Sequence, residues 1–149
     1  MATQAQYAAQ PVLETALLVQ ASLDTSRSSP ATSVEITAGP STAAGVGVGK
    51  RITKITATEV QNAAGSAGTA NLLRFWIEEA TDTNAAKRLI VEKIVPAITP
   101  TVGTTAGFRT EVPELVGLVL PGHPTDPPRI YVSANSAATF HITVESALL

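Results

Sequence analysis

The two histidines are the side chains of this sequence best suited to bind a metal ion or to transfer a proton. His123 lies in the segment HPTDPP, and His141 lies on the polar side of an alternating stretch near the C-terminus. A zinc site needs three or four converging ligands, and Asp126 and Glu145 would complete one only if the fold brought them together. Nothing in the spacing requires this, so the sequence predicts surface histidines without a metal-binding or catalytic role.

Motifs for nucleophilic catalysis and phosphate binding are incomplete. Serines are present throughout, but no Gly-x-Ser-x-Gly turn presents one as a nucleophile for a His base and an orienting acid. The stretch Gly45–Lys50 (GVGVGK) superficially suggests a phosphate-binding loop, which requires GxxxxGK followed by Ser or Thr. Ala44 stands where the first glycine belongs, and Arg51 follows the lysine. We therefore predict a flexible linker here.

Charged side chains form only small groups. Glu78, Glu79 and Asp82 could supply oxygen ligands to Ca²⁺, but their spacing is not that of an EF-hand and predicts a solvated turn. Basic residues beside the predicted strands could pair with acidic groups of a partner, although exposed charges are common there: Lys50, Arg51, Lys54, Lys87 and Arg88. No cofactor is expected, and the chain is not predicted to be an enzyme.

Length and composition narrow the class of protein further. The chain has 149 residues. A domain of this size buries about 68–70% of the surface that its unfolded chain exposes, so it can form a core without disulfides or a structural metal. This chain has no cysteine, a net charge of −2 and 15% charged residues, below the roughly 25% of typical domains. A nucleic-acid-binding protein would carry a basic excess. A surface poor in charge and rich in Ala and Thr is more typical of proteins that assemble.

No part of the sequence is predicted to enter a membrane. Its apolar runs are shorter than the roughly 18–20 residues needed to span a bilayer. The N-terminal stretch MATQAQYAAQPVLETALLVQ has no basic residue before its apolar part, as a secretory signal would. We expect a protein that is made in a cytoplasm and stays there, or is built into something assembled there.

Two apolar runs joined by a polar link form the stretch around which the chain is organised. In Leu72–Glu78, the residues Leu73, Phe75 and Ile77 share one face, which is the period of a strand. The run Lys87–Val95 is rich in β-branched residues. Together they predict a long antiparallel hairpin at the centre of an all-β domain.

Trp76, the only tryptophan, falls on the opposite side of the first run. It could fill a gap in the core, lie at a subunit interface, where Trp is enriched, or stack on a sugar.

Further strands are predicted on both sides of this hairpin. Val12–Val19 is either a strand or two helical turns. Lys50–Val60 is predicted to be a strand. Ile52 and Ile55 are three residues apart, so in a regular strand their side chains would point to opposite faces. The strand therefore contains a β-bulge near Thr53–Lys54 or has both faces partly covered. The remaining apolar or alternating segments are Ser33–Thr37, Phe108–Val112, Leu115–Leu120, and a closing hairpin of Arg129–Ser133 and Thr139–Glu145 around Ala134–Ala138.

About eight short strands separated by turn-forming residues predict an all-β domain, a β-sandwich, jelly roll or barrel. We expect a single β-sandwich or jelly-roll-like domain over residues 12–149. Residues 1–11 are expected to form an extended arm, in which a short helix over Thr3–Gln10 is compatible with the Ala and Gln content.

Several phrases together resemble a group of small virion proteins of tailed bacteriophages. A Gly/Thr/Ala-rich loop separates two of the strand-like phrases, as in that group, and the resemblance covers most of the chain. The segment His123–Pro128 departs from the pattern. The matching phrases are Gln6–Pro11, Arg51–Ala57, Gln61–Ala70, Leu72–Ile77, Arg88–Pro100, Leu118–Gly122 and Ser133–Val144.

The resemblance implies a capsid decoration (cement) protein, which would bind the outside of an icosahedral head and clamp neighbouring subunits of the major capsid protein. Proteins of this kind are small β-folds that often form trimers at three-fold positions, so we expect a homo-oligomer, most simply a trimer, on the virion. The arm and first strand, Ala2–Leu18, would reach onto the capsid or a sister subunit. The expected interface residues are Gln6, Tyr7, Pro11, Leu13, Trp76 and Tyr131.

The alternative is a binding module of a head fibre or tail that recognises a host surface glycan. It would use Trp76, Tyr131 and the HPTDPP loop. Glycan sites usually present several aromatic side chains on one face, and this chain has three Phe, two Tyr and one Trp. An enzyme is the third and most distant possibility.

Overall fold

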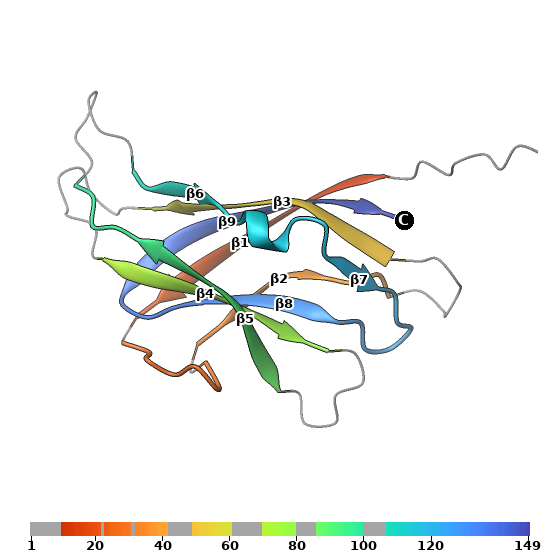
Figure 1. The fold of residues 1–149 in the computed structure, drawn as a ribbon, viewed down its shortest axis with the longest axis horizontal. Helices are drawn as coiled ribbons and strands as arrows, with labels where there is room; N and C mark the ends of the chain where they lie inside the picture. Colours follow the sequence, from red (N-terminus) through yellow and green to blue (C-terminus); the bar gives the residue numbers. More distant parts are fainter. Residues whose placement is uncertain are drawn as a thin grey trace, which may run out of the picture.

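A computed structural model of the protein describes residues 10–21, 23–30, 32–41, 49–60, 70–79, 86–99 and 107–149. Within these ranges the chain forms nine β-strands, one 3₁₀ turn and no α-helix. The strands make two antiparallel sheets that lie face to face (Figure 1). The predicted all-β sandwich is therefore confirmed.

The first sheet, the upper layer in Figure 1, has the order β1-β9-β3-β6, and β7 pairs with β3 at the end away from β6. Every pair in this sheet is antiparallel. Its strands are β1 (Pro11–Gln20), β3 (Gly49–Glu59), β6 (Arg109–Glu111), β7 (Val119–Pro121) and β9 (Ala138–Leu148).

The second sheet, the lower layer, has the order β2-β8-β4-β5. A short 3₁₀ turn, η1 (Pro113–Leu115), connects β6 to the segment before β7. The strands of the second sheet are β2 (Val34–Ala38), β4 (Asn71–Glu78), β5 (Lys87–Val95) and β8 (Arg129–Ala134).

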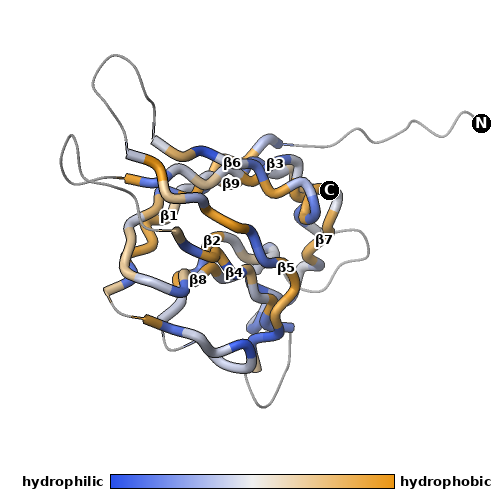
Figure 2. Tube along the Cα trace, turned by 60° about the vertical axis from the view of Figure 1, so that its left-hand side comes forward, coloured by the Kyte–Doolittle hydropathy of each residue, from blue (hydrophilic) through white to orange (hydrophobic). Residues whose placement is uncertain are grey.

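Alternate residues of the strands fill the space between the sheets. On β9 the inward-facing residues are Phe140, Ile142 and Val144, and on β4 they are Leu73 and Phe75, with Ile77 packed against them, as the alternation predicts. Hydrophobic and hydrophilic stretches consequently alternate along the tube in Figure 2. Among the residues that the structure describes, seventeen buried side chains make up this core, so the sandwich is held mainly by apolar burial between its layers.

The structure decides between the alternatives that the sequence left open for two segments. The stretch predicted as either a strand or two helical turns is the strand β1, which pairs with β9 along its whole length. The bulge predicted near Thr53–Lys54 is confirmed, because the pairing of β3 with β9 shifts between Ile52 and Lys54. The extra residue, Thr53, lets both Ile52 and Ile55 reach the core.

The predicted closing hairpin is wrong. The last two strands belong to different sheets: β8 pairs with β2 and β4, whereas β9 pairs with β1 and β3. The connection after Ala134 crosses between the layers, and Asn71 holds it. The Oδ1 of Asn71 accepts the N–H groups of Asn135 (3.1 Å) and Ser136 (3.2 Å), and its Nδ2 donates to the Ser136 carbonyl (3.0 Å).

The central hairpin is confirmed as a pair but not as the centre of its sheet. Strands β4 and β5 are antiparallel neighbours, yet β5 is the last strand of the second sheet. The run Leu115–Leu120 is not one strand, because it contains the end of η1, a turn at Gly117 and the start of β7. Gly117 has φ +89°, a conformation that favours glycine.

Candidate interaction surface

Strand β1 carries the most exposed apolar stripe of the first sheet. Its odd-numbered residues face outward, and among them Leu13, Leu17 and Val19 are 67%, 49% and 53% exposed. Its even-numbered residues face inward, where Leu18 is part of the core. A strand that is apolar on both faces at the end of a sheet exposes surface of the kind found at protein interfaces.

A shallow depression of about 470 Å³ lies at the beginning of β1. Pro11 and Leu13 form one side of it, Thr53 of the β3 bulge another, and Glu145 and Ser146 of β9 the rest. The bulge therefore shapes this end of the sheet. Two of the predicted interface residues, Pro11 and Leu13, lie together here, next to the point at which residues 1–9 enter the domain.

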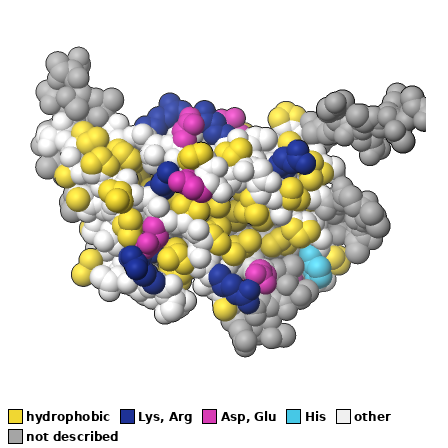
Figure 3. All heavy atoms as spheres, viewed as in Figure 1, with side chains coloured by type: hydrophobic (Ala, Val, Ile, Leu, Met, Phe, Trp, Pro, Cys, Tyr) yellow, Lys and Arg dark blue, Asp and Glu magenta, His cyan; other side chains and the backbone are white. Residues whose placement is uncertain are grey.

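A second apolar surface lies at the opposite side of the sandwich. Figure 3 shows it as a band of apolar side chains across the face on which β5, η1 and β7 lie. A groove of about 440 Å³ runs between Ile77, Ile90 and Val91 of the second sheet and Leu115 and Leu118 of the η1 segment. Other exposed apolar residues of these elements are Ile94 of β5, Val116 after η1 and Val119 of β7.

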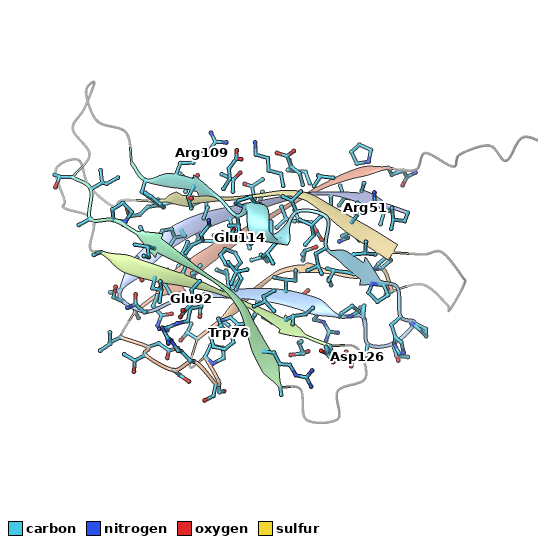
Figure 4. The ribbon with its side chains drawn as sticks, viewed as in Figure 1. Arg51, Trp76, Glu92, Arg109, Glu114 and Asp126 are labelled. Atoms are coloured by element: carbon cyan, nitrogen blue, oxygen red, sulfur yellow. The ribbon has the colours of Figure 1, made fainter. Side chains whose placement is uncertain are left out.

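An ion pair spans the rim of this groove. The Nζ of Lys93 on β5 donates to the Oε1 of Glu114 in η1 at 2.7 Å, and Figure 4 shows Glu114 on η1 between the two layers. The hydrogen bond from Lys93, helped by a backbone hydrogen bond, lowers the pKa of Glu114. Because the carboxylate is largely exposed, the pair contributes little stability and serves mainly to join β5 to η1.

Trp76 and Tyr131 lie on the outer face of the second sheet. Trp76 is fully buried, outside the core between the layers, and Figure 4 shows it on the side of the second sheet that faces away from the first. Tyr131 is partly covered by Lys87, whose Nζ lies 4.1 Å from the ring centroid. Neither residue offers an open aromatic platform, which weighs against the glycan-binding alternative.

The remaining predicted interface residues, Gln6 and Tyr7, lie outside the described residues. So does Asp82 of the acidic link, while Glu78 binds Arg129 (3.1 Å) and Glu79 binds Arg88 (2.7 Å).

The sequence reasoning did not single out Leu17 and Val19. Their signal was present, since a strand with apolar residues at both odd and even positions cannot bury both faces at the end of a sheet.

The candidates for chemistry are dispersed in the structure. The Nδ1 of His123 accepts the N–H of Asp126 (2.9 Å) and so closes the HPTDPP turn. His141 lies on β9, opposite Leu17. Among the described residues, no group of three or more His, Asp or Glu side chains is placed to hold a metal ion.

Lys50, the lysine of the GVGVGK stretch, is not available to bind phosphate. Its Nζ is almost buried between the sheets, where it donates to the Oε1 of Glu14 at 2.8 Å and to the Oγ1 of Thr37 at 3.2 Å. Thr37 in turn donates to the other carboxylate oxygen of Glu14. The three residues come from β3, β1 and β2, so they join the two sheets at their β1–β2 side.

Comparisons with known proteins returned no match among family models, curated proteins or solved structures. In the part of the chain that the structure describes, no helix has the length and apolarity to cross a membrane.

Proposed function

We propose that the protein is a non-enzymatic virion protein that decorates a phage capsid and stabilises it by clamping neighbouring subunits of the major capsid protein. The exposed apolar stripe of β1 carries this proposal. Most of it belongs to Ala2–Leu18, the segment expected to reach onto the capsid or a sister subunit, and it includes Pro11 and Leu13. Partner binding would bury an apolar surface that is costly to leave in water.

We propose further that the fold is a jelly roll. If β7 is set aside as an insertion, eight strands remain, and they pair first with last, second with seventh, third with sixth, and fourth with fifth. A long hairpin rolled up on itself has this pairing, and jelly rolls occur in viral capsid proteins and lectins. The strand order is therefore compatible with a virion protein.

Binding to empty capsids tests the function. Full-length protein is expected to sediment with capsids that lack decoration protein, and a variant without Met1–Gln10 is expected to bind much more weakly. A matched control, Arg109→Ala on β6, changes an exposed side chain on the far end of the same sheet and should bind normally. Full-length protein that stays in the supernatant would overturn the proposal.

Light scattering tests the expected assembly. The resemblance favours a trimer, which would be recognised as three times the mass of the 15.3 kDa chain, or as six times that mass where a second contact joins two trimers. A protein that is monomeric both in solution and on the capsid would contradict the proposed homo-oligomer.

A further inference from the structure

Strand β1 has one unoccupied edge among the described strands, because it is the first in the order β1-β9-β3-β6. Leu148 donates its N–H to the Gln10 carbonyl at 3.2 Å. In an antiparallel ladder the backbone groups of alternate residues point to the same side. The even-numbered residues of β1 therefore bond β9, and the backbone groups of Leu13, Thr15, Leu17 and Val19 point to the free edge.

The other four terminal strands are protected against pairing, and β1 is not. Strand β7, which pairs only with β3, has three residues and ends in a proline. Strand β2 has only five residues and a bulge at Ile36, and β6 has only three residues, two of them charged. Strand β5 carries Lys87, Arg88 and Lys93 and a bulge at Ile90. Short length, lysines and bulges are the usual means of blocking edge-to-edge association.

By contrast, β1 has ten residues in unbroken register with β9. Its one charged residue, Glu14, turns inward to Lys50. The proline at its start, Pro11, removes a single N–H from the free edge and leaves the others in place. A long, regular, apolar edge of this kind is expected to be covered by another strand.

We propose that the strand covering it is β1 of a second copy of this chain, running antiparallel about a two-fold axis at Thr15. This register opposes Pro11 to Val19 of the second copy, Leu13 to Leu17, and Thr15 to Thr15. All five outward-facing residues then have an apolar or threonine partner, and cross-strand pairs of this type stabilise sheets. The two first sheets become one continuous sheet across the axis.

The charges favour the same register. Glu14 is opposed to Ala16 of the second copy, so the two carboxylates do not face each other, as they would in the register centred on Glu14. A two-fold contact is isologous, which means that one self-complementary surface is used twice. The β1 sequence has this property because its outward residues read apolar, apolar, threonine, apolar, apolar from either end.

The contact does not rest on the capsid role. Acting alone it gives dimers, and together with a three-fold contact it would join two trimers. In either case the number of copies in solution is even.

The absence of cysteine makes a direct test possible. Directly opposed residues of a hydrogen-bonded antiparallel pair have Cα atoms about 5.5 Å apart, within the range that a disulfide bridges. Oxidised Thr15→Cys protein is therefore expected to run as a covalent dimer. The control Thr143→Cys, which is the neighbour of Thr15 on β9 and also faces outward, is expected to remain uncrosslinked.

Two further variants fix the register. Leu13→Cys and Leu17→Cys should each give little dimer alone and a covalent dimer when the two proteins are mixed, unfolded, refolded together and oxidised. Leu17→Lys, at an exposed position, should halve the mass measured by light scattering while Trp76 fluorescence stays that of the folded protein. A wild-type mass of one or three copies at every concentration, or equal cross-linking of Thr15→Cys and Thr143→Cys, would overturn the proposal.

Discussion

The indole Nε1 of Trp76 donates a hydrogen bond of 2.8 Å to the Oγ of Ser133, on the face of the second sheet that turns away from the core. Both groups are buried, although the outer face of a sandwich is ordinarily wet. Residues 23–30 contact this face, where Arg27 pairs with Glu92 of β5. Arg74, two pairs along the ladder, donates from Nη1 to the Asp24 carbonyl (2.8 Å) and from Nε to Glu92 (3.1 Å).

Trp76 fluorescence reports this arrangement. Because the side chain is fully buried, its emission should be blue-shifted and resistant to acrylamide in the free protein, and adding capsids should change it little. Trp76→Phe removes the hydrogen bond and part of the packing, and should lower the free energy of unfolding by about 2–4 kcal/mol. Urea denaturation followed by circular dichroism measures this loss. Strong quenching of the free protein would contradict the buried position.

The Asn71 side chain should be essential to the crossing between β8 and β9. Asn71→Asp keeps the acceptor for the Asn135 and Ser136 N–H groups but places an oxygen against the Ser136 carbonyl. Asn71→Ala removes every contact. We expect losses of about 1–3 kcal/mol for both variants in urea denaturation. The Ser136 carbonyl loses the Asn71 donor in both variants, and the Ser136 N–H loses its acceptor in Asn71→Ala, whereas the Asn135 N–H keeps the Leu72 carbonyl (3.1 Å).

Ser136→Ala is the matched control for this prediction. It lies in the same connection, but its hydroxyl is exposed and makes only a 3.4 Å contact with the Ala70 carbonyl. Its stability should stay within about 0.5 kcal/mol of the wild type. If the control loses as much stability as the Asn71 variants, the crossing is not held by the carboxamide.

Strand positions could be predicted from the sequence because they depend on local alternation. Phe140, Ile142 and Val144 alternate with polar residues and face the core as expected. The β3 bulge was visible for the same reason, since two core isoleucines of opposite parity require an extra residue between them.

The pairing of strands was less predictable, because it depends on contacts far apart in the sequence. The short segment between β8 and β9 is compatible with a hairpin. Its crossing path is held by hydrogen bonds to Asn71 and Leu72, more than 60 residues earlier, and to Asp24. The hydrogen bond from Arg74 to the Asp24 carbonyl likewise joins segments far apart in the sequence, and the composition of residues 23–30 predicts only a loop. The candidate surface on β1 was partly predicted, because Pro11 and Leu13 were expected interface residues. Its full extent depends on the position of β1 at the end of its sheet, which the sequence does not reveal.

The Glu14–Lys50 pair should show energetic coupling between the sheets. Lys50→Met leaves a half-buried carboxylate with Thr37 alone, and Glu14→Gln leaves a nearly buried ammonium without its counter-ion. Each should cost about 1–3 kcal/mol, less than the 3–5 kcal/mol of a fully buried pair, because Glu14 retains 30% of its side-chain exposure. The double variant should lose less than the two single losses added together. Strict additivity in urea denaturation would mean that the pair contributes no coupling.

Tyr131 should make the protein less stable at alkaline pH. Burial, followed by the negative charges of Glu78 and Glu35, raises the pKa of Tyr131 above its ordinary value of 10.0. The folded state therefore holds the phenol proton more tightly than the unfolded chain does. The contribution of Tyr131 to the free energy of unfolding is therefore fully present below about pH 9. It is lost as the pH rises through the pKa of the unfolded state toward the pKa of the folded state.

Tyr131→Phe isolates this effect, because every other titrating group is common to both proteins. The difference in the free energy of unfolding between wild type and variant should be constant from about pH 7 to about pH 9. It should then move in favour of the variant as the pH rises through the ordinary pKa of 10.0 toward the raised pKa of the folded state. Urea denaturation at each pH measures the difference. The tyrosinate absorbance of the wild type minus that of the variant, which retains Tyr7, gives the pKa independently. A difference that stays constant across the whole range would mean that the folded protein does not raise the pKa of Tyr131.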